Sequence, residues 1–89
     1  MNTRFPYYQD PGHGWVAVKR TLLRTLGIED RITPYSFQRG GTVYLEEDCD
    51  MATFHHAAKA AGIEPNYLPR HTDKNSPIRS YERFVPERL

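Results

Sequence analysis

Residues whose types could do chemistry gather first in the segment Asp10-Pro11-Gly12-His13-Gly14-Trp15. Pro11 and Gly12 favour a tight turn, which places His13 at an exposed loop tip where backbone amides are open to a ligand. The segment lacks the further glycine or the Gly-Lys-Ser/Thr sequence of a phosphate-binding loop. We therefore interpret it as a chain reversal that anchors Trp15 in the core, and we take His13 as a candidate contact for a partner.

The second chemically dense segment is the acidic run at residues 46–50. Carboxylates at the start of a helix stabilise its N-terminus, and Asp50 suits the N-cap position. The run holds more acids than capping requires, so we predict an acidic surface that docks against a basic partner; helix capping alone is the alternative. The predicted partner-binding residues are Glu46, Glu47, Asp48 and Asp50, with His13 and Arg39 on the adjoining exposed edges.

No spacing in the sequence predicts a metal site or a catalytic centre. His55 and His56 are adjacent, whereas two zinc ligands on one helix face need an i, i+4 spacing. Cys49 has no second thiol, and its acidic neighbours oppose thiolate formation at a helix start. His13 and His71 could meet only through the fold. We therefore expect no catalytic residues, no metal and no cofactor, and a protein that is not an enzyme.

Length and cysteine content narrow the class of protein. Eighty-nine residues correspond to a single domain, residues 1–89. The one cysteine excludes an internal disulfide, and the N-terminal sequence has no apolar run typical of a signal peptide, so we expect a cytoplasmic protein. No stretch approaches the roughly 18 apolar residues of a membrane span, and we expect no membrane partner.

The net charge of +1 does not give the one-sided basic field of a DNA-binding domain. Cations and aromatic residues nevertheless alternate near the C-terminus, as they do on surfaces that stack single-stranded nucleic acids. Nucleic-acid binding is therefore the alternative function. Its candidate residues are Arg70, His71, Lys74, Arg79, Arg83 and Arg88, with Tyr67, Tyr81 and Phe84 between them.

The elements that must position these residues follow from the periodicity of apolar residues. Strands are predicted at residues 5–9, 15–18, 32–37, 42–45 and 66–68, with turns at Pro-Gly and Gly-Gly dipeptides. Amphipathic helices are predicted at residues 18–26 and 50–61, and each ends in Gly-Ile, which is typical of a left-handed C-terminal cap. The predicted fold class is α+β, a small, mostly antiparallel sheet with both helices packed on one face.

Two structures are predicted as alternatives for the C-terminal part of the chain. Residues 71–77 form a polar loop, and Ser76 suits the cap of a short helical turn that begins at Pro77. A less ordered tail over residues 71–89 is the alternative. Because the core of so short a chain is small, a homodimer through a sheet edge or a helix face is a further expectation.

The strings DPGHGW, LLRTLGI, ITPYSFQRGGTVYLEEDCD, AAKAAGI and HTDKNSPIRSY span most of the chain. Together they resemble a family of small accessory proteins of bacteriophages and mobile elements, for which no activity is assigned. The resemblance carries over no functional residue. It implies an accessory protein expressed inside a bacterial cell, and we expect it to bind a host protein without catalysis. Inhibition of a host defence system such as CRISPR is one concrete form of this expectation.

Overall fold

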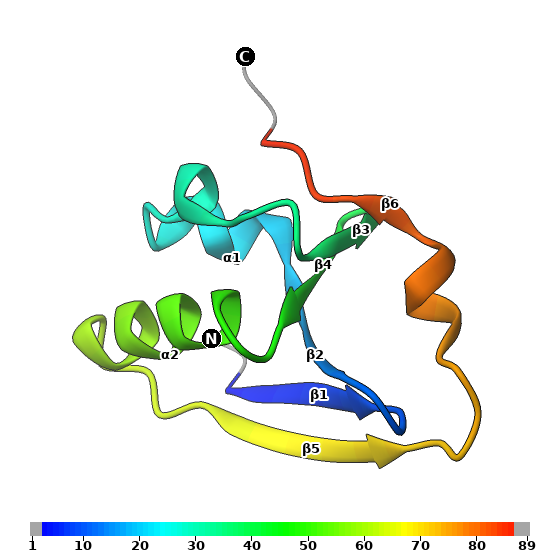
Figure 1. Ribbon diagram of the computed structural model, residues 1–89. Coiled ribbons are helices and arrows are strands. Elements are labelled where there is room, and N and C mark those ends of the chain that lie inside the picture. The colour runs from blue at the N-terminus through cyan, green and yellow to red at the C-terminus, as the bar shows by residue number, and fades with distance from the viewer. Residues whose placement is uncertain (1–2, 87–89) are drawn as a thin grey trace.

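Alternating apolar residues build the centre of a six-stranded sheet in the order β5-β1-β2-β4-β3-β6. The computed structural model describes residues 3–86. The strands are β1 Arg4–Gln9, β2 Gly14–Lys19, β3 Phe37–Arg39, β4 Thr42–Glu46, β5 Asn66–His71 and β6 Glu82–Arg83. Neighbours are antiparallel except β1 and β5, which run parallel. The predicted α+β class with a mostly antiparallel sheet is confirmed (Figure 1).

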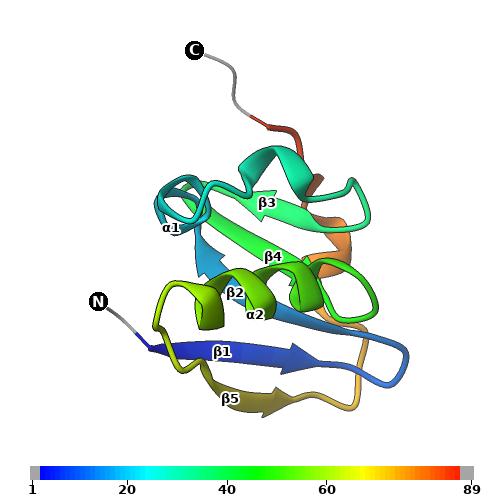
Figure 2. The same cartoon turned by 90° about the vertical axis from the view of Figure 1, so that its left-hand side faces the viewer.

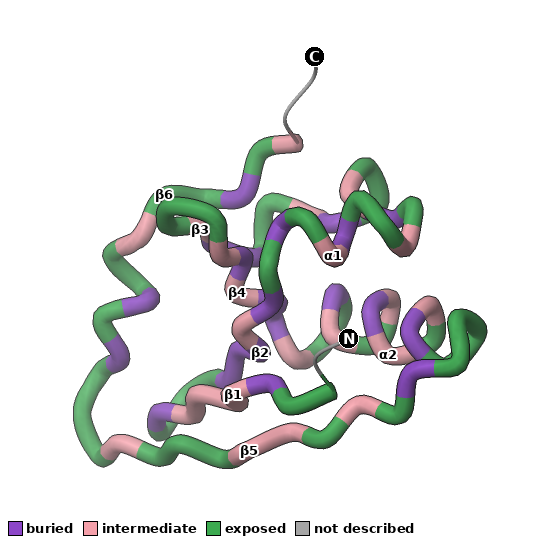
Figure 3. Tube along the Cα trace, turned by 180° about the vertical axis from the view of Figure 1, so that it is seen from behind, coloured by how far each residue is buried: buried purple, intermediate pink, exposed green. Residues whose placement is uncertain are grey.

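Two short helices, α1 (Arg20–Thr25) and α2 (Asp50–Ala60), cover one face of the sheet (Figures 1 and 2). The larger core lies between this face and the helices, and buried residues recur along β2, β4 and both helices (Figure 3). Its fully buried side chains include Val16, Leu45 and Phe54. The predicted placement of both helices on one face is therefore confirmed.

A second, smaller core lies on the opposite face of the sheet. It consists of Trp15, Phe37 and Ile78, with tyrosines packed around it. The period of two along β2 and β4 creates both cores, because Val16 and Trp15 point to opposite faces. The short 3₁₀ turn η2 (Pro77–Ser80) covers this second face.

Both helices end as the Gly-Ile pairs predict. Gly27 and Gly62 have φ angles of 73° and 81°. The N–H of Ile28 donates to the Leu23 carbonyl at 3.0 Å, and the N–H of Ile63 donates to the Ala58 carbonyl at 2.9 Å. This is the Schellman arrangement, in which the residue after the glycine folds back into the core.

The starts of the helices differ from the prediction. α1 begins at Arg20 instead of residue 18, because Val18 and Lys19 still pair with β4. α2 begins at Asp50, so the prediction of Asp50 as N-cap is wrong by one residue. The N-cap is Cys49, whose side chain makes no capping hydrogen bond.

The predicted strand over residues 32–37 is wrong except for Phe37. Residues Glu29–Arg31 form the 3₁₀ turn η1, and the chain then runs to β3 without strand pairing. Thr33 and Ser36 bind the Asp50 carboxylate, and these side-chain bonds take the place of a ladder. β3 and β4 nevertheless form the predicted hairpin, with Gly40 and Gly41 as its turn.

The C-terminal segment packs on the sheet at buried positions between residues 76 and 84, and the alternative of a less ordered tail over residues 71–89 stays a prediction. The predicted turn is confirmed, since Ser76 Oγ accepts a hydrogen bond from the N–H of Ile78 at 3.2 Å. Ile78 and Phe84 are buried. Residues 87–89, which include the candidate Arg88, lie outside the described range.

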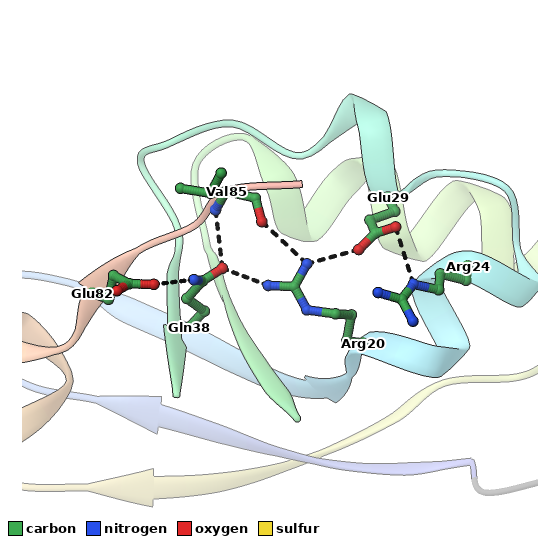
Figure 4. A network of polar contacts seen from close by, with 6 residues as sticks. All are labelled: Arg20, Arg24, Glu29, Gln38, Glu82 and Val85. Atoms are coloured by element: carbon green, nitrogen blue, oxygen red, sulfur yellow. Dashed lines mark hydrogen bonds and ion pairs between the residues drawn. The ribbon is translucent and has the colours of Figure 1, made fainter. Parts of the chain in front are cut away.

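Arg20 ties this segment to the helix side of the sheet (Figure 4). Its guanidinium donates to Glu29 at 2.7 Å and to the Val85 carbonyl at 3.1 Å. Gln38 Oε1 accepts hydrogen bonds from both Arg20 and the N–H of Val85. The guanidinium also lies 4.9 Å from the centre of the Phe84 ring. Within residues 3–86, no helix has the length and apolarity needed to cross a membrane.

We expect Gly62→Ala to lower the free energy of unfolding by about 1–2 kcal/mol, because a Cβ is strained in the left-handed region. No atom lies within 4 Å of the position that this Cβ would take, so the loss comes from the backbone alone. Urea unfolding measures it. Gly41→Ala is the matched control, since it also meets no atom within 4 Å and Gly41 is not among the glycines with positive φ. Equal losses in both variants would contradict the role of the cap.

Candidate functional site

A cleft of about 550 Å³ opens beside the smaller core, at the end of the sheet where the β1–β2 turn meets the end of β4. Trp15 and Phe37 form its aromatic floor, with ring centres 6.2 Å apart. Tyr35 also lines the cleft, and this residue is 67% exposed. The apolar floor and the exposed tyrosine make this the candidate binding site.

The guanidinium groups of two arginines stack on the aromatic rings of the floor and form a charged wall of the cleft. The guanidinium of Arg79 lies 5.4 Å from the centre of the Trp15 ring, and that of Arg83 lies 4.8 Å from the centre of the Phe37 ring. Arg83 also donates a hydrogen bond to the carbonyl of Pro34 at 3.2 Å. These stacked cations place positive charge at one end of the cleft.

The buried carboxylate of Asp10 holds this wall to the β1–β2 turn. Its oxygens accept hydrogen bonds from Arg79 Nε at 2.6 Å and Nη2 at 2.8 Å. They also accept the N–H groups of Gly12, His13 and Ser76 at 2.9–3.0 Å. The bonds from Arg79, followed by those from the backbone amides, hold the pKa of Asp10 well below its usual value despite the opposing effect of burial.

A second buried carboxylate, Asp50, fixes the segment that carries Tyr35. Its oxygens accept hydrogen bonds from the N–H and hydroxyl of Thr33 at 2.7–3.1 Å and from Ser36 Oγ at 2.5 Å. Ser36 Oγ accepts the N–H of Glu46 at 2.9 Å. Asp50 is 0% exposed, so the prediction that it contacts a partner is wrong: its carboxylate is used inside the fold.

The structure brings together three of the predicted partner-binding residues. One ligand atom of each of His13, Glu46 and Asp48 lies within 4.8 Å of the other two, and all three line the cleft. The strand register explains this: Trp15 pairs with Glu46, which places the β1–β2 turn beside the end of β4. His13 and Asp48 are exposed, whereas Glu46 is only 9% exposed.

Two further predicted residues lie elsewhere. The Glu47 carboxylate accepts the hydroxyl hydrogen bond of Tyr7. Burial, followed by this bond and the charge of Glu47, raises the pKa of Tyr7 to about 12. Arg39 does not line the cleft, and its guanidinium lies 4.9 Å from the centre of the Tyr81 ring. The acidic residues predicted to form one continuous surface therefore lie in different environments: two line the cleft, one binds Tyr7 and one is buried.

Cys49 lies in the cleft lining and is exposed. The charge of Asp50, followed by burial and the charge of Glu46, raises the pKa of the Cys49 thiol. Since the thiolate is the reactive form, this environment suppresses its reactivity, as the acidic neighbours in the sequence predict.

The residues predicted to bind nucleic acid are dispersed. Arg79 is held by Asp10, and Arg83 lies over Phe37, both in the cleft wall. His71 instead contacts Asp73 at 3.2 Å, at the end of β5. The stacking partners of these cations are buried or half-buried rings, which leaves few free faces for bases.

The sequence interpretation missed the roles of Asp10, Arg79 and Tyr35. Asp10 was assigned only to a turn, although a carboxylate before Pro-Gly is well placed to accept the amides that follow it. Its bond to Arg79 joins residues far apart in the chain and has no local signal. The β1–β2 hairpin pairs with the β3–β4 hairpin through β2 and β4, and this register places Glu46 beside the β1–β2 turn.

Comparison with known proteins identifies no family for this chain. Scans against models of protein families, curated proteins and solved structures find no match for this chain. The resemblance to phage and mobile-element proteins stays a prediction, and the function is inferred from the cleft.

We expect Asp10→Asn to destabilise the protein at neutral pH, because an amide cannot pair with Arg79 and turns an N–H group toward it. A depressed folded-state pKa adds stability that is present above the pKa of the unfolded chain and lost as the pH falls below about 4. The difference in melting temperature between wild type and variant should therefore shrink below that pH. Asp73→Asn is the control, because that side chain is 98% exposed. A difference independent of pH would contradict the assignment.

We expect Ser36→Ala to cost about 1–3 kcal/mol of unfolding free energy, because it removes one of the donors to the Asp50 carboxylate and leaves the N–H of Glu46 without the hydroxyl that accepts it. Chemical denaturation measures the loss. Ser80→Ala, at an exposed serine, should change stability by less than about 0.5 kcal/mol. Similar values for the two variants would show that the Ser36 bridge contributes little.

Proposed function

We propose that the protein acts by binding, and that it captures a segment of another protein in the cleft between the β1–β2 turn and Tyr35. The exposure of Tyr35 above an aromatic floor carries this proposal. Tyrosine and arginine are enriched where proteins recognise one another, because they offer large rigid contact areas together with hydrogen bonds. A cleft of this size accommodates one or two side chains of a partner.

The charges around the floor indicate the chemistry of the partner segment. An apolar or aromatic side chain would pack chiefly on the exposed ring of Tyr35, because the Trp15 and Phe37 rings beside it are buried. A carboxylate next to it would meet Arg83, whose guanidinium donates one hydrogen bond among residues 3–86, to the Pro34 carbonyl. His13 and Asp48 line the other side, where they can bond the peptide groups of the same segment.

The resemblance to accessory proteins of phages and mobile elements supports a bacterial host protein as the partner. On this proposal the protein works in the cytoplasm of the host cell without catalysing a reaction. It occupies a recognition surface of its target, and inhibition of a defence system such as CRISPR is the concrete form. The single free cysteine fits a reducing compartment.

We expect Tyr35→Ser and Arg83→Glu each to weaken partner binding by at least roughly tenfold, as at interface hot spots. The tagged protein captures its partner from bacterial lysate, the captured protein is identified and purified, and the dissociation constant is then measured for each variant.

Two matched controls separate the cleft from the rest of the surface. Val85 is the other exposed large apolar residue in the described part of the chain and does not line the cleft, so Val85→Ser should bind as the wild type does. Arg31→Glu makes the same charge reversal as Arg83→Glu, outside the cleft. Weakening by the controls but not by the cleft variants would place the interface elsewhere. Binding of nucleic acid instead of protein would support the alternative function.

A further inference from the structure

The carboxylate end of the cleft combines side chains that ligate metals. Each of His13, Glu46 and Asp48 offers one ligand atom, and these atoms all lie within 4.8 Å of one another. We propose that these three residues bind a divalent transition-metal ion, with zinc as the preferred ion. The sequence predicts no metal site because the ligands follow no motif spacing; the hairpin register brings them together.

The geometry suits a site with three protein ligands. Zinc binds imidazole nitrogen and carboxylate oxygen at about 2.0–2.2 Å, which sets ligand atoms around one ion about 3–4 Å apart, and the three atoms here lie within 4.8 Å of one another. His13 and Asp48 are exposed and free to rotate inward. The backbone of His13 is fixed, because its N–H donates to Asp10 at 2.9 Å. One coordination position would remain open toward the cleft.

The burial of Glu46 is the second, independent observation. Glu46 is 9% exposed and lines the cleft, and among residues 3–86 its carboxylate accepts one hydrogen bond, from the N–H of Asp48 at 2.9 Å. No ion pair joins Glu46 to a basic side chain in that range. A buried charge is costly unless a cation or metal compensates it, and the neighbouring Asp48 adds a second negative charge.

Neither of the two arginines that line the cleft forms an ion pair with Glu46, and Arg83 donates instead to the Pro34 carbonyl at 3.2 Å. Arg79 lines the same cleft, but two of its guanidinium nitrogens donate to Asp10 at 2.6 and 2.8 Å. A metal ion from solution can supply the compensating charge. An imidazole with two carboxylates favours zinc, and manganese more weakly, over magnesium and calcium, which prefer sites made of oxygen ligands alone.

The test uses the isolated full-length protein, so it does not depend on the partner proposed above. Titration calorimetry with zinc should show about one ion bound per chain, and zinc should raise the melting temperature. Magnesium and calcium at the same concentration should do neither. Cobalt can replace zinc as a probe, and its visible absorption reports the ligand geometry.

His13→Ala and Asp48→Asn should each weaken zinc binding by more than about 100-fold, since altering even an outer-shell residue costs 10–100-fold. Both side chains are exposed, so the variants should fold. Their melting temperatures in the absence of metal should therefore match that of the wild type. His56→Ala, Cys49→Ser and Tyr35→Ser are the controls and should bind zinc as the wild type does. Unchanged binding in His13→Ala, or binding lost only in Cys49→Ser or His56→Ala, would overturn the proposal.

Discussion

The carboxylate of Asp10 is the contact on which the arrangement of this molecule depends. It joins the β1–β2 turn to the start of η2, two parts of the chain that no strand pairing connects. Through Arg79 it also sets the cation that stacks on Trp15. Without this contact, η2 would lose its polar anchor to the β1–β2 turn, and Ile78 would be held over the second face of the sheet by apolar packing and the pairing of β6.

Asp50 is a second buried carboxylate that holds two segments together, on the other side of the cleft. Each carboxylate is buried and accepts both backbone N–H groups and side-chain donors, which satisfies the charge inside the fold. Asp10 fixes the wall that carries His13, and Asp50 fixes the wall that carries Tyr35. Because both walls are held before any ligand arrives, binding in the cleft requires little ordering of the protein.

The features that could be predicted from the sequence are those set by neighbouring residues. Gly62-Ile63 ends a helix through contacts within one turn, and Gly40-Gly41 needs only its flanking strands. The misplaced strand before Phe37 shows the limit: β-branched and aromatic residues favoured a strand, but Asp50 captured the segment through long-range bonds. The cleft could not be predicted either, because His13, Glu46 and Asp48 meet only through the strand register, which sequence spacing does not reveal.

The open edge of the sheet at β5 is a second exposed surface, but its chemistry opposes pairing with another strand. Asn66 and Thr72 donate their N–H groups toward β1 at 2.7 and 2.9 Å. Since successive residues of a strand alternate in direction, Pro69 turns its nitrogen to the outer edge, where it has no hydrogen to donate. Another strand added at β5 would lack a hydrogen bond at its centre, as in protected edges of natural sheets. A partner that binds through side chains, as proposed for the cleft, does not meet this obstacle.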